Sequence, residues 1–151
     1  MTEVLDQISD ELIENEYRKQ FFLKAGDPVH SSEEAAKHFT AMFSSDPSRE
    51  CFAVMYLNGR NALISVDVLF KGTLTASAVY PREIIKKALE NHAAAIICSH
   101  NHPSGNLNPS GDDMTITKRI KAACETVDIA FHDHLIVTSE GFYSFADHGL
   151  L

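Results

Sequence analysis

One short segment of the sequence, residues 99–113 (SHNHPSGNLNPSGDD), concentrates side chains that bind metal ions. His100 and His102 are separated by one residue, and residues i and i+2 of an extended chain point the same way, about 6.5 Å apart. Both imidazoles can therefore reach one ion placed between them. The prolines and glycines that follow predict a turn that brings Asp113 back towards the histidines. Two imidazoles, one carboxylate and one water form an open tetrahedral site that suits catalytic zinc.

The end of this segment also fits the start of a helix without any metal. Ser110 and Asp113 have nearly the spacing of a capping box, and apolar residues recur at helical intervals after them. In that interpretation Ser110 caps the helix and Asp113 favours the positive end of the helix dipole. The two interpretations are compatible at Ser110, because a helix N-terminus also fixes a hydroxyl rigidly beside a metal. Taken singly, Ser110 and Asp113 favour the helix cap. Taken together with the two histidines, they favour the metal site.

The surrounding elements predict a small α/β sandwich with a mixed sheet. The continuous apolar run at 93–99 predicts a strand buried on both faces, and the histidines lie at its C-terminal end, where α/β sheets usually place their chemistry. Two β-branched and aromatic runs, at 51–58 and 62–70, predict antiparallel neighbours joined by a turn. Further elements are predicted as helices at about 31–43, 81–91 and 114–125 and as strands within 129–139 and 141–146.

Composition favours one soluble, cytoplasmic domain. The chain has 151 residues, of which 44% are hydrophobic, and this is enough for one core. No apolar run is long enough to span a bilayer, and the acidic, polar N-terminus does not fit a signal peptide. We therefore expect no membrane association. The three cysteines are far apart and form no CxxC pair, so they predict buried, reduced thiols: Cys51, Cys98 and Cys124.

Charge limits the partners that we expect. The formal net charge of -8 argues against direct binding to DNA, because phosphate contacts come largely from Lys and Arg. A role on DNA would need a local basic patch or a protein partner. Near the N-terminus, apolar residues at helical spacing predict an amphipathic helix that docks on the core or, as an alternative, forms a homodimer contact.

The motif resembles a known family. His100-x-His102, seven residues, Ser110, two residues and Asp113 match the signature of the JAMM (MPN-plus) metalloproteases. Together with YPREIIKKAL at 80–89, the SHNHPSG stretch is similar to the RadC family. The resemblance covers about residues 30–151, so we expect an N-terminal helix and linker at 1–30 and a RadC-like JAMM domain at 31–151. It implies a JAMM/MPN-like (cytidine-deaminase-like) sandwich of a mixed, largely antiparallel sheet flanked by helices.

The resemblance also implies roles for the matching residues. One zinc ion would be held by His100, His102 and Asp113, with water in the fourth position, and would lower the pKa of that water to about 7. The match to the family's general base and acid is Glu50, which the residues alone do not distinguish from other glutamates such as Glu33, Glu34 and Glu83. Ser110 would donate a hydrogen bond to the oxygen of the tetrahedral intermediate. The implied reaction is hydrolysis of a peptide or isopeptide bond in a peptide or protein substrate.

A second His-x-His pattern occurs at His132 and His134. A histidine in a strand often only forms a hydrogen bond, so ligation is not the favoured interpretation here. The RadC-like match is the pair Asp133 and His134. We expect this pair to line the pocket or support the metal-binding loop and not to bind zinc.

Two functions of different classes remain open at this point. The first is a stand-alone zinc hydrolase, with DNA repair as its setting by association with the RadC name. RadC proteins commonly carry an N-terminal helix-hairpin-helix region, which the short, acidic N-terminal part of this sequence does not match. The alternative is a non-catalytic, zinc-stabilised binding module in DNA metabolism. Such a module needs neither Glu50 nor Ser110, so the presence of both favours the enzyme.

Overall fold

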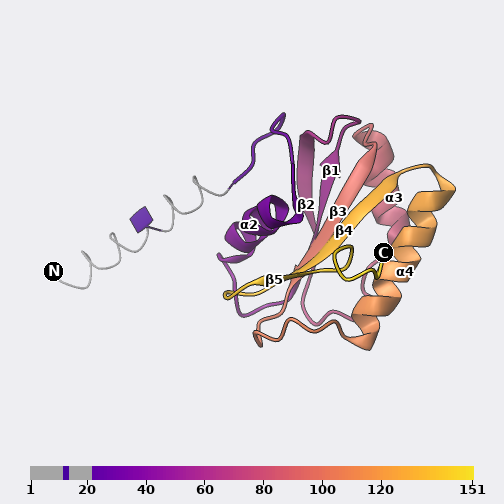
Figure 1. Ribbon diagram of the computed structural model, residues 1–151. Helices are drawn as coiled ribbons and strands as arrows, with labels where there is room; N and C mark the ends of the chain where they lie inside the picture. The colour runs from indigo at the N-terminus through magenta and orange to yellow at the C-terminus, as the bar shows by residue number, and fades with distance from the viewer. Residues whose placement is uncertain (1–11, 14–21) are drawn as a thin grey trace.

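The computed structural model describes residues 12–13 and 22–151 and contains a five-stranded sheet with helices on both faces (Figure 1). The expected N-terminal helix falls almost entirely on residues outside those described. The elements in chain order are α2 (Ser32–Phe43), β1 (Cys51–Leu57), β2 (Leu63–Lys71), α3 (Pro81–Glu90), β3 (Ala95–Asn101), α4 (Gly111–Thr126), β4 (Ala130–Val137) and β5 (Phe142–Ser144).

The sheet has the strand order β2-β1-β3-β4-β5. β1 is antiparallel to β2 and to β3, β3 is parallel to β4, and β4 is antiparallel to β5. The parallel pair requires a crossover, which α4 provides. The prediction of a mixed, largely antiparallel α/β sheet flanked by helices is thus confirmed, as the resemblance to the JAMM/MPN-like fold implies.

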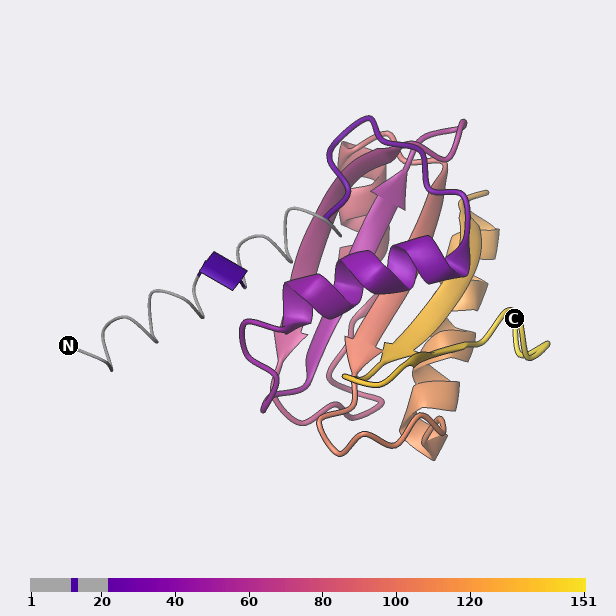
Figure 2. The same ribbon diagram turned by 60° about the vertical axis from the view of Figure 1, so that its left-hand side comes forward.

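The helices cover the two faces of the sheet unequally (Figure 2). α2 lies on one face, where Phe39 and Phe43 pack into a core cluster with apolar side chains of β1 and β3. α3 and α4 lie on the other face, where Ile84, Ile116 and Ile120 pack into a second cluster. Because β1 and β3 are central and covered on both faces, every residue of each strand is buried.

The register between β1 and β3 determines what lies beside the histidines. Phe52, the second residue of β1, pairs with His100, near the end of β3. The residues just before β1 therefore lie beside the residues that end β3, although about fifty positions separate them in sequence. β3 also continues two residues beyond the predicted end at 99, so that His100 is held in the sheet and His102 directly follows it.

Two further expectations concern the cysteines and membrane segments. All three cysteines are free and buried, as predicted. Among the described residues, none of the helices has both the length and the apolar character that a bilayer-spanning segment requires.

Candidate metal centre

Three of the predicted residues converge at the C-terminal end of β3. His100, His102 and Asp113 each offer one ligand atom, and these atoms all lie within 4.8 Å of one another. The two Nε2 atoms are 3.0 Å apart, and each lies 3.2 Å from a different carboxylate oxygen of Asp113. Two nitrogen donors and a carboxylate that point at one small volume could hold a divalent metal ion.

Each ligand candidate is held by a different element. His100 is completely buried in β3. His102 begins the loop: its backbone N–H donates to the carbonyl of Val137 in β4 (3.0 Å), and its ring Nδ1 lies 2.5 Å from the carbonyl oxygen of Asn106. Because a carbonyl only accepts, Nδ1 of His102 carries the proton and Nε2 is left free for a ligand. Gly105 supplies the positive φ of +83° that the turn between them requires.

Asp113 forms the helix cap and also lies where the predicted metal site requires a carboxylate. Ser110 is the N-cap of α4, its hydroxyl accepts from the backbone N–H of Asp113 (3.0 Å), and the Asp113 carboxylate accepts from the backbone N–H of Ser110 (2.8 Å). This capping box fixes the carboxylate in the first turn of α4 and aims its oxygens at the histidines. The helix cap and the candidate metal site are therefore one structure.

Electrostatics favour an ionised carboxylate at this site. Burial acts to raise the pKa of Asp113, but the close approach of the His100 and His102 rings and the hydrogen bond from the backbone N–H of Ser110 outweigh it and hold this pKa well below its usual range. The pKa of His102 is raised because a protonated ring would donate a hydrogen bond to Asp113, and burial partly offsets this effect. The carboxylate thus remains an anion, which is the form that binds a cation.

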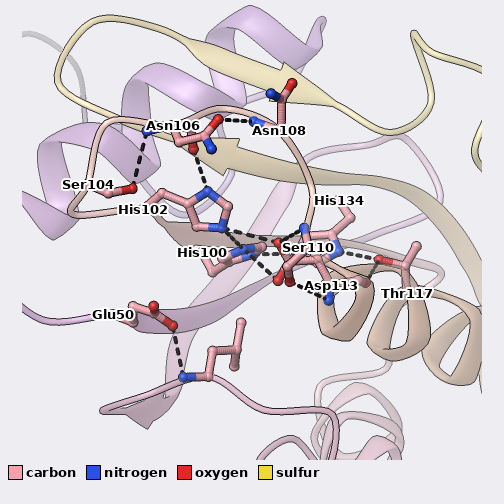
Figure 3. A network of polar contacts seen from close by, with 11 residues as sticks. Glu50, His100, His102, Ser104, Asn106, Asn108, Ser110, Asp113, Thr117 and His134 are labelled. Atoms are coloured by element: carbon pink, nitrogen blue, oxygen red, sulfur yellow. Dashed lines mark hydrogen bonds and ion pairs between the residues drawn. The ribbon is translucent and has the colours of Figure 1, made fainter.

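Glu50 lies beside this cluster, as the β1–β3 register requires. It lines a cleft of about 690 Å³ together with His102 and Ser110. Its Oε2 accepts from the backbone N–H of Leu74 at 2.8 Å, the bond drawn to Glu50 in Figure 3. Among the described residues, no donor contacts Oε1, so this oxygen is available to a molecule in the cleft.

Asn101 is a residue of the site that sequence reasoning missed. Its Oδ1 accepts from the backbone N–H of Cys51 (2.7 Å), and its Nδ2 donates to the backbone carbonyl of Arg49 (2.8 Å). These two bonds hold the backbone on both sides of Glu50. The alternation of a strand predicts only that Asn101 points away from the two histidines.

The side chains of Asp133 and His134 lie in different surroundings, and only His134 contacts the ligand cluster, through His100. The Asp133 carboxylate accepts from the hydroxyl of Ser144 and the backbone N–H of Ala146, and so ties β4 to β5. His134 is buried in contact with His100, and burial lowers its pKa well below the ordinary value. His132 lies apart from the cluster, with Nε2 2.8 Å from Oδ1 of Asn61.

Comparison with known proteins agrees with this geometry. A family model described as "RadC-like JAB domain" matches residues 29–150. UPF0758 protein YfjY of Escherichia coli (strain K12) is 46% identical over 121 residues, which are 80% of this chain and 76% of that protein. UPF0758 protein YeeS of the same strain is 46% identical over 80% of this chain and 82% of its own length. A UPF0758 protein of Acidovorax sp. (strain JS42) is 42% identical over 82% of this chain, and the match spans only 52% of that longer protein.

Proposed function

Because the chain belongs to the RadC-like JAB domain family, we propose that it is a JAMM-type, zinc-dependent hydrolase that cleaves a peptide or isopeptide bond. One observation carries the proposal: His100, His102 and Asp113 converge within 4.8 Å beside a cleft that Glu50 and Ser110 also line. A purely structural metal site would use the three ligands and would need neither of the last two residues.

The three ligand residues would hold the ion beside the cleft, which His102 lines. His100 and Asp113 are buried, whereas the side chain of His102 is 14% exposed and faces the cleft. A zinc ion bound there supplies Lewis acidity and makes water a good nucleophile near neutral pH. Because His102 and Ser110 line the cleft, water and substrate could reach such an ion from it.

Glu50 and Ser110 would carry the proton and charge transfers. Glu50 takes a proton at its free Oε1 as water adds to the carbonyl carbon, and gives it to the amine nitrogen when the C–N bond breaks. Ser110 already accepts from Asp113 through its oxygen, and among the described residues no acceptor takes its hydroxyl proton. That proton can be donated to the substrate carbonyl oxygen, which becomes negative in the transition state.

The mostly polar residues that line the cleft favour a polar substrate. The lining of the cleft comes from the loop at 102–110 and from Arg49, Gly72 and Thr73. We propose a peptide or protein as the substrate. If the setting is DNA repair, we propose that a protein partner provides the DNA contact, since the chain has a formal net charge of -8.

The test compares metal content and hydrolysis in four proteins purified without chelator or affinity nickel. We expect about one zinc per chain in the wild type, in Glu50→Gln and in the control Glu83→Gln, and none in the His100→Ala/His102→Ala double variant. Screening with peptide and isopeptide substrates should show turnover in the wild type and in Glu83→Gln, with a loss of about 10²–10⁴-fold in Glu50→Gln. A wild type that takes up no zinc, or a Glu50→Gln variant that loses it, would contradict these roles.

A further inference from the structure

A chain of buried hydrogen bonds runs behind His100, on the side of its ring away from the ligand cluster (Figure 3). Nδ1 of His100 lies 2.8 Å from Nε2 of His134. Nδ1 of His134 lies 2.6 Å from Oγ1 of Thr117. That hydroxyl in turn lies 2.7 Å from the backbone carbonyl oxygen of Asp113. The side-chain carboxylate of the same residue is one of the ligand candidates. All four residues are buried.

The chemistry of the last link determines the direction of every hydrogen bond in the chain. A backbone carbonyl only accepts, so the single hydroxyl proton of Thr117 is donated to Asp113. The Thr117 oxygen must then accept from the neighbouring imidazole, which places a proton on Nδ1 of His134. A neutral imidazole with a proton on Nδ1 has only a lone pair on Nε2.

The surroundings of His134 favour the neutral ring. Its exposed fraction is 0%, and its ring stacks on Phe145 (centroids 4.8 Å apart) and meets the ring of Phe52 edge to face at 5.6 Å. Its two nitrogens contact a hydroxyl and another imidazole, and within residues 12–13 and 22–151 neither contacts a carboxylate. A cation in this apolar position, without a carboxylate in contact with it, is strongly disfavoured.

The tautomer of His134 determines which ring nitrogen of His100 carries a proton. Since Nε2 of His134 can only accept, Nδ1 of His100 must donate to it, and Nε2 of His100 is left without a proton. That Nε2 is the atom that faces His102 and Asp113. The opposite direction of donation would place the proton on Nε2 of His100 and block this ligand atom.

We propose that Thr117 and His134 are positioning residues that hold His100 in the tautomer with a free Nε2 directed at the metal. The inference rests on the proposed function for the presence of a metal. Ligand histidines generally donate their second N–H to a fixed acceptor, and here the acceptor is a third imidazole oriented by a helix hydroxyl. Because the chain ends on the backbone of Asp113, it also links two ligands to each other.

Thr117→Val tests the chain with little change of shape, since it replaces the hydroxyl by a methyl group. Without that acceptor, the proton of His134 is no longer fixed on Nδ1. We expect zinc affinity, measured by competition with a chromophoric chelator, to fall by about 10–100-fold. Thr117→Ser keeps the hydroxyl and should restore affinity to near the wild-type value.

The same helix offers a matched control. Thr126 also donates its hydroxyl to the carbonyl four residues earlier, that of Ala122, at 2.9 Å, and it is exposed. Thr126→Val should bind zinc as the wild type does, which separates loss of the hydrogen-bond chain from a general effect of valine on α4. Wild-type affinity in a folded Thr117→Val would overturn the inference.

A spectroscopic measurement reports the tautomer of His134 directly. Long-range ¹H–¹⁵N correlation spectra of the metal-free wild type report which ring nitrogen of each histidine carries the proton. We expect His134 to be neutral with its proton on Nδ1, and we expect this signature to be lost in Thr117→Val and retained in Thr117→Ser. A proton on Nε2 of His134 would overturn the inference even in a protein that binds zinc and hydrolyses peptides. A wild type that binds no zinc would instead overturn the proposed function.

Discussion

The side-chain oxygen of Asn101 accepts a hydrogen bond from the backbone N–H of Cys51 at 2.7 Å, at the start of the strand that follows Glu50. The side-chain nitrogen of Asn101 donates to the carbonyl of Arg49, so one buried asparagine fixes the chain on both sides of the proposed general base. The residue between the two histidines of the motif therefore helps to position Glu50. It links the strand that carries His100 to the residue expected to move the proton.

Asn101→Ala should impair hydrolysis without removing the metal. The loss of both hydrogen bonds frees Glu50 to shift, and a displacement of about 1 Å in a catalytic group costs up to about 10²-fold in rate. The unpaired backbone N–H of Cys51 should also lower the free energy of unfolding by about 1–3 kcal/mol. Zinc content, turnover and thermal unfolding check these expectations. Asn108→Ala, at an exposed position, is the control for stability, and loss of zinc from Asn101→Ala would argue against a role through Glu50.

The local parts of the site were predictable from sequence. His100, His102, Ser110 and Asp113 lie within fourteen positions, and their types and spacing determine both the helix cap and the ligand cluster. The elements were predictable for a similar reason, since apolar periodicity determines which face is buried. The predicted helix at about 31–43 corresponds closely to α2.

The remaining parts depend on tertiary register. Glu50 comes beside the histidines only because β1 pairs antiparallel with β3, and nothing in the residues around it distinguishes it from other glutamates. Thr117 carries no signal at all, because a threonine in the middle of a helix is unremarkable until the fold places His134 against it. Resemblance to a family selected Glu50 and pointed to His134, but it did not predict the contact of His134 with His100.

Two substitutions at Ser110 separate its cap from its hydroxyl proton. Ser110→Ala removes both and should lower the free energy of unfolding by about 1 kcal/mol, whereas Ser110→Gly at an N-cap costs only a few tenths of a kcal/mol. Both remove the donor to the substrate oxygen, so both should lower kcat by about 10²–10³-fold. Denaturant unfolding and single-turnover rates measure the two effects. A glycine variant with near wild-type rate would mean that Ser110 serves only the helix.

His38 predicts a pH dependence of stability that is independent of the metal site. Burial lowers the pKa of His38 from 6.5 to about 4, and its Nδ1 accepts from the backbone N–H of Leu23 at 2.8 Å. Between these pH values the unfolded chain binds a proton that the folded protein does not, so stability falls as the pH falls from about 6.5 to about 4. The full effect is about 3 kcal/mol, since one pKa unit corresponds to about 1.4 kcal/mol.

His38→Asn isolates this contribution, because the amide oxygen replaces Nδ1 as acceptor and does not titrate. The free energy of unfolding, measured in denaturant from pH 7.5 to 4, should decline less steeply in this variant than in the wild type. His30→Asn, at an exposed position, is the matched control and should retain the steeper decline. Equal slopes in the wild type and in His38→Asn would show that this ring is protonated without cost.

Zinc should stabilise the folded chain, and only through the cluster at the end of β3. An ion that binds the folded state alone adds about 2.7 kcal/mol at a free concentration one hundred times its Kd, or roughly 5–10 °C in Tm for a domain of this size. His102→Ala should abolish this shift. The matched control is His132→Ala, which removes a histidine of the second His-x-His pattern whose ring contacts Asn61 outside the cluster. Calorimetric scans with zinc and with chelator should show the full shift in the wild type and in His132→Ala. A shift that survives in His102→Ala, or disappears in His132→Ala, would place the ion away from His100 and Asp113.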